Sequence, residues 1–433
     1  MDKVRYAAIN ALLRQEQGGY SNLVLQNVLE KNPRFSAREK AFLSAVFYGV
    51  VERQFTIDFL LQKCLNRPLR KLDAVVRAIL RAGLYQIRWM DGVPIHAAVN
   101  ESVSLTKGMR KTSAAGLVNA VLRRASEIDL EKETFSDPIQ RLSVVYSVSP
   151  EIAALFLEKL PDRCEEILRA SFSHPDLCIR VNSLKTSPEI LRKYFQEKGI
   201  SVREGRVPGC FYVDFHGDLA ADEAFQRGMF HVQGEASQIA CAALSPRPGE
   251  KVLDLCAAPG GKSVTLAQYM ENRGQLCARD AAENRLSLIE EAFRRCGVTC
   301  GQVRCADAAV FDEKLCDADA VLCDVPCSGL GILSKKPDIR CKDLKGLPEL
   351  LHIQREILCT AAKYVKPGGR LVYSTCTLNP DENEKTVQAF LRENSEFYVK
   401  KVPYSKENSG MTTFYPYEQE ADGFFVACLE RTR

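Results

Sequence analysis

The chain has 433 residues, enough for two to four domains at about 100–200 residues per domain. Its 46% hydrophobic and 26% charged residues are the ordinary balance of a globular protein. No stretch approaches the roughly eighteen apolar residues of a membrane-spanning helix. The N-terminal "MDKVRYAAINALLRQEQGGY" has an amphipathic pattern without the apolar core of a signal peptide, so we expect a cytoplasmic protein.

Seventeen cysteines are scattered through hydrophobic runs such as "VLDLC" and "AVLC", which is typical of small buried side chains rather than of disulfides. The chain has no Cys-x-x-Cys pair, and none of its five histidines lies at ligand spacing from a cysteine pair. We therefore expect no metal site.

Charge is unevenly distributed along the chain. Residues 1–125 hold 20 Lys and Arg against 9 Asp and Glu, a net charge of +11, so the remainder carries −7 within the total of +4. A basic domain joined to a mildly acidic one predicts nucleic-acid binding by the first. The alternative is that long helices simply carry solvated lysines and arginines.

Residues 1–127 are predicted to form a helical domain. Apolar residues recur at three- and four-residue spacing in "AREKAFLSAVFYGVVERQFTIDFLLQKCL" and in "LDAVVRAILRAGLYQIRWM". Pro68, Gly92 and Gly108 mark turns, and the polar "SEIDLEKETFSDP" predicts a connector.

Residues 140–235 mix short patterns and predict a small linking domain of α/β or α+β type. "CIRVNSL" and "FYVDF" are typical of strands, and "SPEILRKYFQEKGI" predicts a helix capped by Ser187.

Residues 236–433 predict a catalytic domain in which strands and helices alternate from about residue 250. The predicted strands are "KVLDLC", "GQLCARD", "CGQVRCAD", "DAVLCDVP" and "GGRLVYSTC". Continuous apolar strands separated by helices predict a Rossmann-like α/β fold with a mostly parallel sheet buried on both faces. Two late strands, "EFYVKKV" and "GFFVACLE", are expected to form an antiparallel edge.

A glycine turn joins the first of these strands to its helix in "VLDLCAAPGGKS", residues 252–263. Ligands of open parallel sheets bind beyond the carboxyl ends of the strands, and Gly260 and Gly261 would let the backbone approach such a ligand closely. The turn matches neither Gly-x-Gly-x-x-Gly nor the Walker loop, which disfavours a nicotinamide dinucleotide or a nucleoside triphosphate.

Aspartates are placed at the ends of three successive strands: Asp254, Asp280 and Asp307. Asp280 is placed to accept hydrogen bonds from both hydroxyls of a ribose, and Asp307 to meet an adenine amino group. Any one of them alone could be a helix cap or a turn residue. Together with the glycine turn, they predict an adenosyl ligand without phosphates.

Three segments, "DLCAAPGGKS", "DVPCSGLG" and "YSTCTLNPDENE", together resemble the Sun family of RNA cytosine-5 methyltransferases. The basic helical domain is similar to the NusB-like domain of the bacterial Fmu/Sun branch, which acts on 16S ribosomal RNA. The resemblance implies a class I methyltransferase fold with S-adenosylmethionine as cofactor. The cofactor-binding candidates are Cys256, Ala257, Ala258, Pro259, Gly260, Gly261, Lys262, Asp280, Arg285, Asp307 and Asp324.

The chemistry of such an enzyme assigns roles to Asp324 and to two cysteines. Carbon 5 of cytosine becomes nucleophilic when a thiolate adds to carbon 6, and an acidic group must meet ring N3, where charge develops. Asp324 suits that second role. Spacing does not distinguish Cys327 from Cys376 as the nucleophile. The resemblance implies that Cys376 attacks and that Cys327 assists breakdown of the adduct, whereas DNA cytosine-5 enzymes attack with the Pro-Cys cysteine.

These observations predict a monomeric, metal-free enzyme that makes 5-methylcytosine in 16S ribosomal RNA, on a base that is unpaired or flipped out. The same chemistry on transfer RNA is one alternative. Another is an RNA-binding assembly or antitermination factor with a vestigial catalytic domain, against which the intact Asp324, Cys327 and Cys376 argue.

Overall fold

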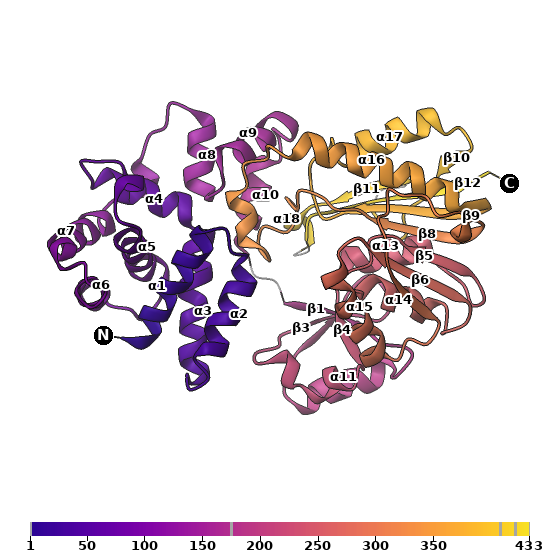
Figure 1. Ribbon diagram of the computed structural model, residues 1–433, viewed down its shortest axis with the longest axis horizontal. Coiled ribbons are helices and arrows are strands. Elements are labelled where there is room, and N and C mark those ends of the chain that lie inside the picture. Colours follow the sequence, from indigo (N-terminus) through magenta and orange to yellow (C-terminus); the bar gives the residue numbers. More distant parts are fainter. Residues whose placement is uncertain (1, 174–175, 407–408, 420–421, 433) are drawn as a thin grey trace. The chain divides into compact units, whose positions relative to one another are not determined.

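The structure is a computed structural model that describes residues 2–173, 176–406, 409–419 and 422–432 (Figure 1). The chain divides into two compact units. The first consists of Met1–Arg169 and Lys335–Leu344, and the second of Ala170–Ser334 and Lys345–Arg433. A ten-residue segment that follows the "DVPCSGLG" motif is therefore part of the first unit.

The described elements of the first unit are all helices, which confirms the predicted helical fold of the N-terminal region. The unit also includes the helices of residues 138–159, which overlap the range predicted for the linking domain. The elements of the unit are α1 (Lys3–Glu16), α2 (Ser21–Lys31), α3 (Ala37–Glu52), α4 (Gln54–Lys63), η1 (Leu69–Lys71), α5 (Ala74–Trp89), α6 (Ile95–Gly108), η2 (Thr112–Ala114), α7 (Ala115–Ser126), η3 (Leu130–Lys132), α8 (Pro138–Tyr146), α9 (Pro150–Lys159), α10 (Cys164–Ala170) and η6 (Pro337–Cys341).

Side-chain caps define where several of these helices begin. The Asp2 carboxylate accepts hydrogen bonds from the backbone of the first turn of α1, and Asp73 does the same for α5. Ser36 and Glu39 form a reciprocal capping box at the start of α3. The apolar faces of α1, α3 and α5 meet in one core, in which Phe47 is fully buried.

Helix α2 is capped from a distant part of the chain. Its own N-cap residue, Tyr20, provides no side-chain cap, and Ser21 instead donates its backbone N–H to Asp338 Oδ2 at 3.2 Å and its hydroxyl to Asp338 Oδ1. Arg340 follows in η6, where it is fully buried and donates to the carbonyl oxygen of Tyr146 at 2.9 Å. Burial lowers the pKa of Arg340 to about 10. Segment 335–344 is thus an integral part of the helical core.

The second unit contains a small α+β layer, as predicted. Its four-stranded antiparallel sheet has the order β2-β3-β1-β4, and Ser187 caps helix α11 by accepting from the Ile190 N–H. The elements are β1 (Leu177–Val181), α11 (Pro188–Glu197), β2 (Val202–Glu204), β3 (Cys210–Val213), η4 (Leu219–Ala221), α12 (Glu223–Gln226) and β4 (Phe230–Val232).

The larger sheet of this unit has the order β10-β12-β9-β8-β5-β6-β7, with β11 paired to β12. Strands β5 to β9 pair in parallel, whereas β12 pairs antiparallel with both β9 and β10. The mostly parallel sheet and its antiparallel edge are therefore as predicted, and β11 is an addition. Its strands are β5 (Lys251–Asp254), β6 (Gln275–Asp280), β7 (Gly301–Cys305), β8 (Ala318–Asp324), β9 (Val365–Thr375), β10 (Phe397–Val399), β11 (Met411–Phe414) and β12 (Phe424–Arg431).

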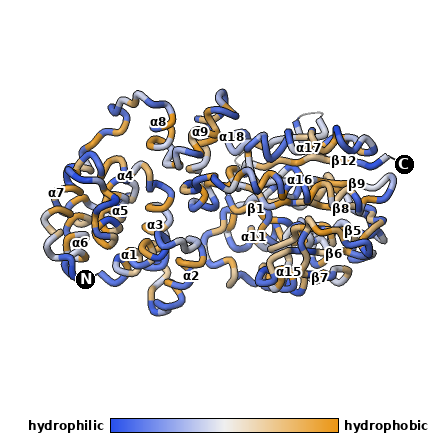
Figure 2. The backbone as a smooth tube through the Cα atoms, turned by 45° about the horizontal axis from the view of Figure 1, so that its top comes forward, coloured by the Kyte–Doolittle hydropathy of each residue, from blue (hydrophilic) through white to orange (hydrophobic). Residues whose placement is uncertain are grey.

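Helices cover both faces of this sheet. Leu266 and Ile289, from the helices of one face, share a core with Val252, whereas Leu358 and Val387, from the other face, share a second core with neighbouring strand residues. Figure 2 shows the strands of this sheet as largely hydrophobic. The helices are α13 (Glu235–Leu244), α14 (Gly261–Tyr269), α15 (Glu283–Cys296), η5 (Glu313–Leu315), α16 (Leu347–Tyr364), α17 (Glu384–Glu393) and α18 (Pro416–Gln419).

The described helices include none that is long and apolar enough to cross a bilayer.

Candidate active site

The predicted site residues lie at the carboxyl ends of strands β5 to β9 or in the segments that follow these strands. The loop after β5, residues 255–260, leads directly into α14. Gly260 has a φ of +102°, and a Cβ there would lie 3.1 Å from the Cα of Ile289 in α15. The structure therefore explains this glycine by its backbone conformation and by close helix packing.

Asp280 supports the glycine loop from the next strand. Its side chain is buried, and its two oxygens accept from the backbone N–H groups of Ala258 and Ala282, both at 3.1 Å. Arg285 contacts both Asp280 and the loop. Its Nη1 lies 3.6 Å from Asp280 Oδ1, and its Nη2 donates to the Ala258 carbonyl oxygen at 2.7 Å. The two predicted cofactor residues, which carry opposite charges, thus hold the loop in position together.

Asp307 lies two residues beyond the end of β7 and is exposed. Its carboxylate accepts from the N–H of Ala309 at 2.9 Å, which is the geometry of a local turn. Because the side chain is exposed, its second carboxylate oxygen is accessible to a ligand.

Asp254 has a buried oxygen with no hydrogen-bond partner in the described part of the chain. Ser263 donates to Oδ2 at 2.6 Å, and Oδ1 is the atom left without a donor. Burial raises the pKa of Asp254 to about 7. A ligand with an ammonium group fits this arrangement, because it would supply both the missing donor and a compensating charge.

An ion pair connects the glycine-loop helix to the fourth strand of the parallel sheet. Lys262 Nζ lies 2.5 Å from Asp324 Oδ2, and Ser374 of β9 donates to Asp324 Oδ1 at 2.7 Å. Burial alone would lower the pKa of Lys262, but the Asp324 carboxylate more than offsets it and raises that pKa. Lys262, predicted as a cofactor residue, is therefore a charged partner of the proposed catalytic aspartate.

The two candidate cysteines come together, as their places after neighbouring strands predicted. Cys327 Sγ and Cys376 Sγ lie 3.3 Å apart, and both side chains are partly exposed. The pKa of Cys327 is raised most by its contact with the Cys376 thiol and next by burial. Burial also raises the pKa of two nearby thiols, Cys256 after β5 and the buried Cys323 in β8, well above the usual range.

Sequence reasoning missed the residues that connect the two cysteine loops: Ser328, Gln354 and Glu382. Glu382 is fully buried between the loops, and its place in the quoted "YSTCTLNPDENE" segment was the available signal. Ser328 directly follows Cys327, but a serine in a loop carries no distinctive pattern.

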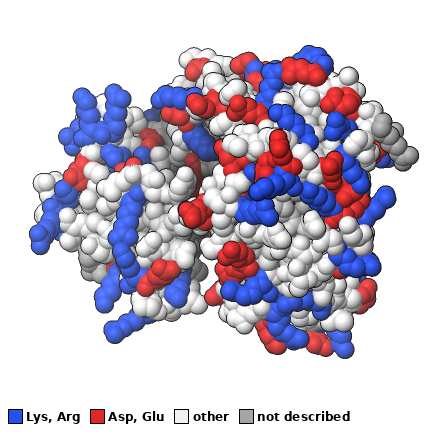
Figure 3. All heavy atoms as spheres, turned by 45° about the vertical axis from the view of Figure 1, so that its right-hand side comes forward, with Lys and Arg blue, Asp and Glu red and all other residues white. Residues whose placement is uncertain are grey.

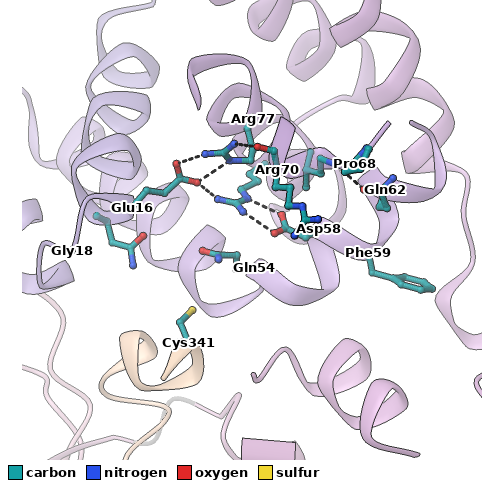
Figure 4. Close-up of a pocket in the computed structure, with 13 residues that line it drawn as sticks. Glu16, Gly18, Gln54, Asp58, Phe59, Gln62, Pro68, Arg70, Arg77 and Cys341 are labelled. Atoms are coloured by element: carbon teal, nitrogen blue, oxygen red, sulfur yellow. Dashed lines mark hydrogen bonds and ion pairs between the residues drawn. The ribbon is translucent and has the colours of Figure 1, made fainter. Parts of the chain in front are cut away.

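A separate cavity of about 840 Å³ lies in the first unit, and none of the predicted site residues line it. It contains an ion-pair network in which Arg81 makes two 2.7 Å contacts with Asp58 and also pairs with Glu16 (Figure 4). Arg77 makes a further 2.9 Å contact with Glu16. These paired charges join α1, α4 and α5, so the network is explained by the packing of the helical unit.

No cluster of three or more metal-ligating side chains occurs among the residues that the structure describes.

The sheet order, the glycine loop and the acidic strand ends define a class I methyltransferase fold. Comparisons with known proteins agree with this class. Residues 241–430 match the family model described as 16S rRNA methyltransferase RsmB/F, residues 2–127 match the NusB family, and residues 153–218 match the ferredoxin-like domain of RsmF/B-like methyltransferases.

Similar proteins cover almost the entire chain. A probable ribosomal RNA small subunit methyltransferase B from Bacillus subtilis is 32% identical over 99% of this chain and 98% of its own, and one from Synechocystis is 34% identical over 95% of each. The crystal structure of PH0851 has a TM-score of 0.83 at 29% identity and covers 98% of both chains. The chain belongs to the RsmB/F family of 16S rRNA methyltransferases.

Membership of this family confirms the predicted resemblance, the fold class and S-adenosylmethionine as the cofactor. The chain is an S-adenosylmethionine-dependent ribosomal RNA methyltransferase.

Proposed function

We propose that this enzyme methylates carbon 5 of a cytosine in 16S ribosomal RNA through a covalent bond from Cys376 to carbon 6. The observation that carries the proposal is the thiol pair: Cys327 and Cys376 have their sulfur atoms 3.3 Å apart, beside the strand that ends in Asp324. A nucleophile and a carboxylate at neighbouring strand ends suit addition to a pyrimidine ring, and a second thiol suits breakdown of the adduct.

The pair itself supports Cys376 as the nucleophile. The neighbouring Cys376 thiol and burial raise the pKa of Cys327, which favours the protonated form of Cys327 and disfavours it as the attacking thiolate. The Cys376 sulfur then bonds to carbon 6, and the electrons of the carbon 5–carbon 6 double bond become available at carbon 5. This order agrees with the family resemblance.

Breakdown of the adduct requires a base for the proton on carbon 5. The Cys327 sulfur lies 3.3 Å from the Cys376 sulfur, so after giving its own proton to water Cys327 is placed to accept the proton on carbon 5. The double bond re-forms as the Cys376–carbon bond breaks, and Cys376 leaves as a thiolate.

Asp324 and Lys262 stabilise the negative charge that develops on the pyrimidine ring. In the free enzyme Asp324 accepts from Lys262 Nζ at 2.5 Å and from Ser374 Oγ at 2.7 Å. We assign Asp324 to ring N3, with the Lys262 ammonium as the proton source behind it.

S-adenosylmethionine supplies an electrophilic methyl group when bound. The residues that would hold it are those of the glycine loop from Cys256 to Lys262, together with Asp280, Arg285, Asp307 and Asp324, and the orphaned Asp254 Oδ1 suits its ammonium group.

The basic helical unit supports RNA as the substrate. On the face shown in Figure 3, Lys and Arg side chains predominate over the helical unit, whereas both signs are interspersed over the other unit. The net charge of +11 in residues 1–125 would hold the phosphate backbone without selecting a base.

The test is to treat 16S ribosomal RNA and transfer RNA with the purified enzyme and S-adenosylmethionine, and then to identify the methylated nucleoside by mass spectrometry and its position by bisulfite sequencing. We expect 5-methylcytosine at one 16S position. Methylation at another atom would contradict the chemistry, and methylation of transfer RNA alone would contradict the substrate.

A further inference from the structure

Glu382 is the most heavily hydrogen-bonded carboxylate near the two cysteines. Its side chain is fully buried, and both oxygens act as acceptors. Oε2 accepts from the Ser328 N–H at 2.8 Å and from Gln354 Nε2 at 3.0 Å. Oε1 accepts from Ser328 Oγ at 2.5 Å, Asn379 Nδ2 at 3.1 Å and Thr377 Oγ1 at 3.3 Å.

Four of these five hydrogen bonds come from the two cysteine loops, and the fifth comes from Gln354 of α16. Ser328 directly follows Cys327, and Thr377 directly follows Cys376. The two hydroxyl groups also contact each other at 2.7 Å, and Gln354 donates from its Nε2 to the carbonyl oxygen of Pro326 at 2.9 Å. Glu382 thus contacts the residue after each cysteine, while Gln354 reaches the residue before Cys327.

No lysine or arginine in the described ranges pairs with Glu382. A buried carboxylate without a cation is costly, and it is tolerated only where several donors point at it. A well-packed apolar side chain would fill the same space at lower cost if support of the backbone were the only requirement. The five hydrogen bonds therefore suggest a requirement for precise placement.

We propose that Glu382 is a positioning residue that holds Cys327 and Cys376 at reacting distance by joining their two loops. The proposal rests on the function proposed above only for its catalytic consequence, since the spacing of the two thiols can be measured without RNA or cofactor. The nucleophile and the second thiol must both reach one pyrimidine ring, so a small displacement of either loop would slow the reaction.

Replacement of Glu382 by glutamine tests this clamp, the set of hydrogen bonds by which Glu382 joins the two cysteine loops, with little change in side-chain shape. An amide has one oxygen and one NH₂ group, so one of the two positions becomes a donor. If the new NH₂ group takes the place of Oε2, it faces the backbone N–H of Ser328, which cannot turn away. If it takes the place of Oε1, it faces the side-chain NH₂ group of Asn379. That Asn379 amide is held in its orientation because its oxygen accepts from the Asp381 N–H at 3.2 Å. Either orientation therefore sets the NH₂ group against at least one donor that cannot turn into an acceptor.

The distance between the thiols can be followed with diamide, which takes up the two protons and two electrons that the thiols lose on forming a disulfide. Peptide mass spectrometry then gives the rate of the Cys327–Cys376 cross-link. We expect Glu382→Gln to slow this cross-link by about tenfold or more. Glu384→Gln is the matched control, because Glu384 lies two residues away, accepts from Thr413 Oγ1 and belongs to a different contact.

Methylation kinetics give the second readout. Glu382→Gln should lower kcat with little change in KM for RNA, since positioning of the reacting sulfur atoms, and not RNA binding, is impaired. A wild-type cross-linking rate in this variant, or the absence of the cross-link in the wild-type protein, would overturn the proposal. If the enzyme methylates a different nucleobase or a different ring atom from the one proposed, the cross-linking rates would still test the role of Glu382.

Ser328→Ala keeps the proposal testable if Glu382→Gln does not fold. It removes one hydroxyl and leaves the carboxylate its other donors, so we expect a smaller reduction, about threefold, in the cross-linking rate. The buried Cys178 and Cys210 sulfur atoms, 3.5 Å apart, provide an internal standard in the same protein. Faster oxidation of that pair would reveal loosening of the whole unit, and an unchanged Cys327–Cys376 rate in Ser328→Ala would count against the clamp.

Discussion

Asp324 and Ser374 are directly opposite each other in the parallel strands β8 and β9, and their side chains share a 2.7 Å hydrogen bond. Cys327 follows the first residue by three positions and Cys376 follows the second by two. The register of two strands therefore places both thiols at one end of the sheet, together with the carboxylate. This arrangement leads to a direct test of the roles of the two cysteines.

Alanine variants of the two cysteines should behave in opposite ways. Cys376→Ala removes the nucleophile, so it should form no bond to RNA and transfer no methyl group. Cys327→Ala should attack and methylate but then remain attached to the RNA, because the base that removes the carbon 5 proton is missing. A denaturing gel with labelled RNA and S-adenosylmethionine would show a shifted band for Cys327→Ala only.

The reverse pattern on that gel would assign the attack to Cys327, as in the DNA cytosine-5 enzymes. Methylation by both variants without any shifted band would argue against covalent catalysis. Cys305→Ala is a suitable control, because Cys305 is exposed and lies at the end of β7.

Asp280→Ala should weaken S-adenosylmethionine binding by about 1–3 kcal/mol, through loss of charged hydrogen bonds. Part of this loss is expected from the loop itself, because Asp280 accepts from the Ala258 N–H. Calorimetric titration measures the change. Asp312→Ala is the control, since Asp312 caps η5. Wild-type affinity in Asp280→Ala would refute the assignment.

The layered architecture and the clustering of the candidate catalytic residues could be predicted because their signals are local. Apolar strand runs, Ser187 at a helix start and the "DVPC" and "STC" segments all lie within a few residues of what they specify. The capping of α2 by Asp338 could not be predicted, because it joins residues 317 positions apart. The donors to Glu382 could not be predicted from the sequence either, since Gln354 comes from the interior of an ordinary amphipathic helix.

Asp254 should make the stability of the protein depend on pH. Its pKa of about 7 lies above the ordinary value of 3.8, so the folded state binds the proton more tightly than the unfolded state. The stability that this proton provides is present below pH 3.8 and is lost as the pH rises through 7, by up to about 4 kcal/mol.

Thermal unfolding of the wild type and of Asp254→Asn between pH 4 and pH 8 checks this expectation. The wild type should lose stability relative to Asp254→Asn as the pH rises, and Asp307→Asn, which changes an exposed carboxylate, should follow the wild type. A difference between wild type and Asp254→Asn that does not change with pH would be contrary to the raised pKa.

Asp338→Ala should destabilise the helical unit although residue 338 lies far along the chain. Loss of the acceptor for the Ser21 N–H and hydroxyl should lower the free energy of unfolding by about 1 kcal/mol. The single tryptophan, Trp89 of α5, lies in this unit, so its fluorescence during urea unfolding reports the change. Asp162→Ala, at an exposed position of the same unit, should leave the midpoint unchanged. Equal midpoints for Asp338→Ala and wild type would show that the cap contributes nothing.

Charge on the helical unit should govern how RNA affinity depends on salt. Lys71, Lys107 and Arg124 are exposed there, and replacement of all three by glutamine should reduce the slope of log affinity against log salt. On single-stranded RNA the reduction should be up to about 0.7 for each phosphate that the variant no longer neutralises. Filter binding at several salt concentrations measures the slope.

The matched control for this salt experiment replaces Arg247, Lys314 and Arg392 by glutamine. All three are exposed on the second unit, and the first two precede β5 and β8, so they lie at the edge of the sheet opposite the site. A slope that falls only in the control variant would place the phosphate contacts on the second unit, because each neutralised phosphate contributes to the slope wherever its cation lies. A fall only in the helical variant assigns those contacts to the NusB-like domain.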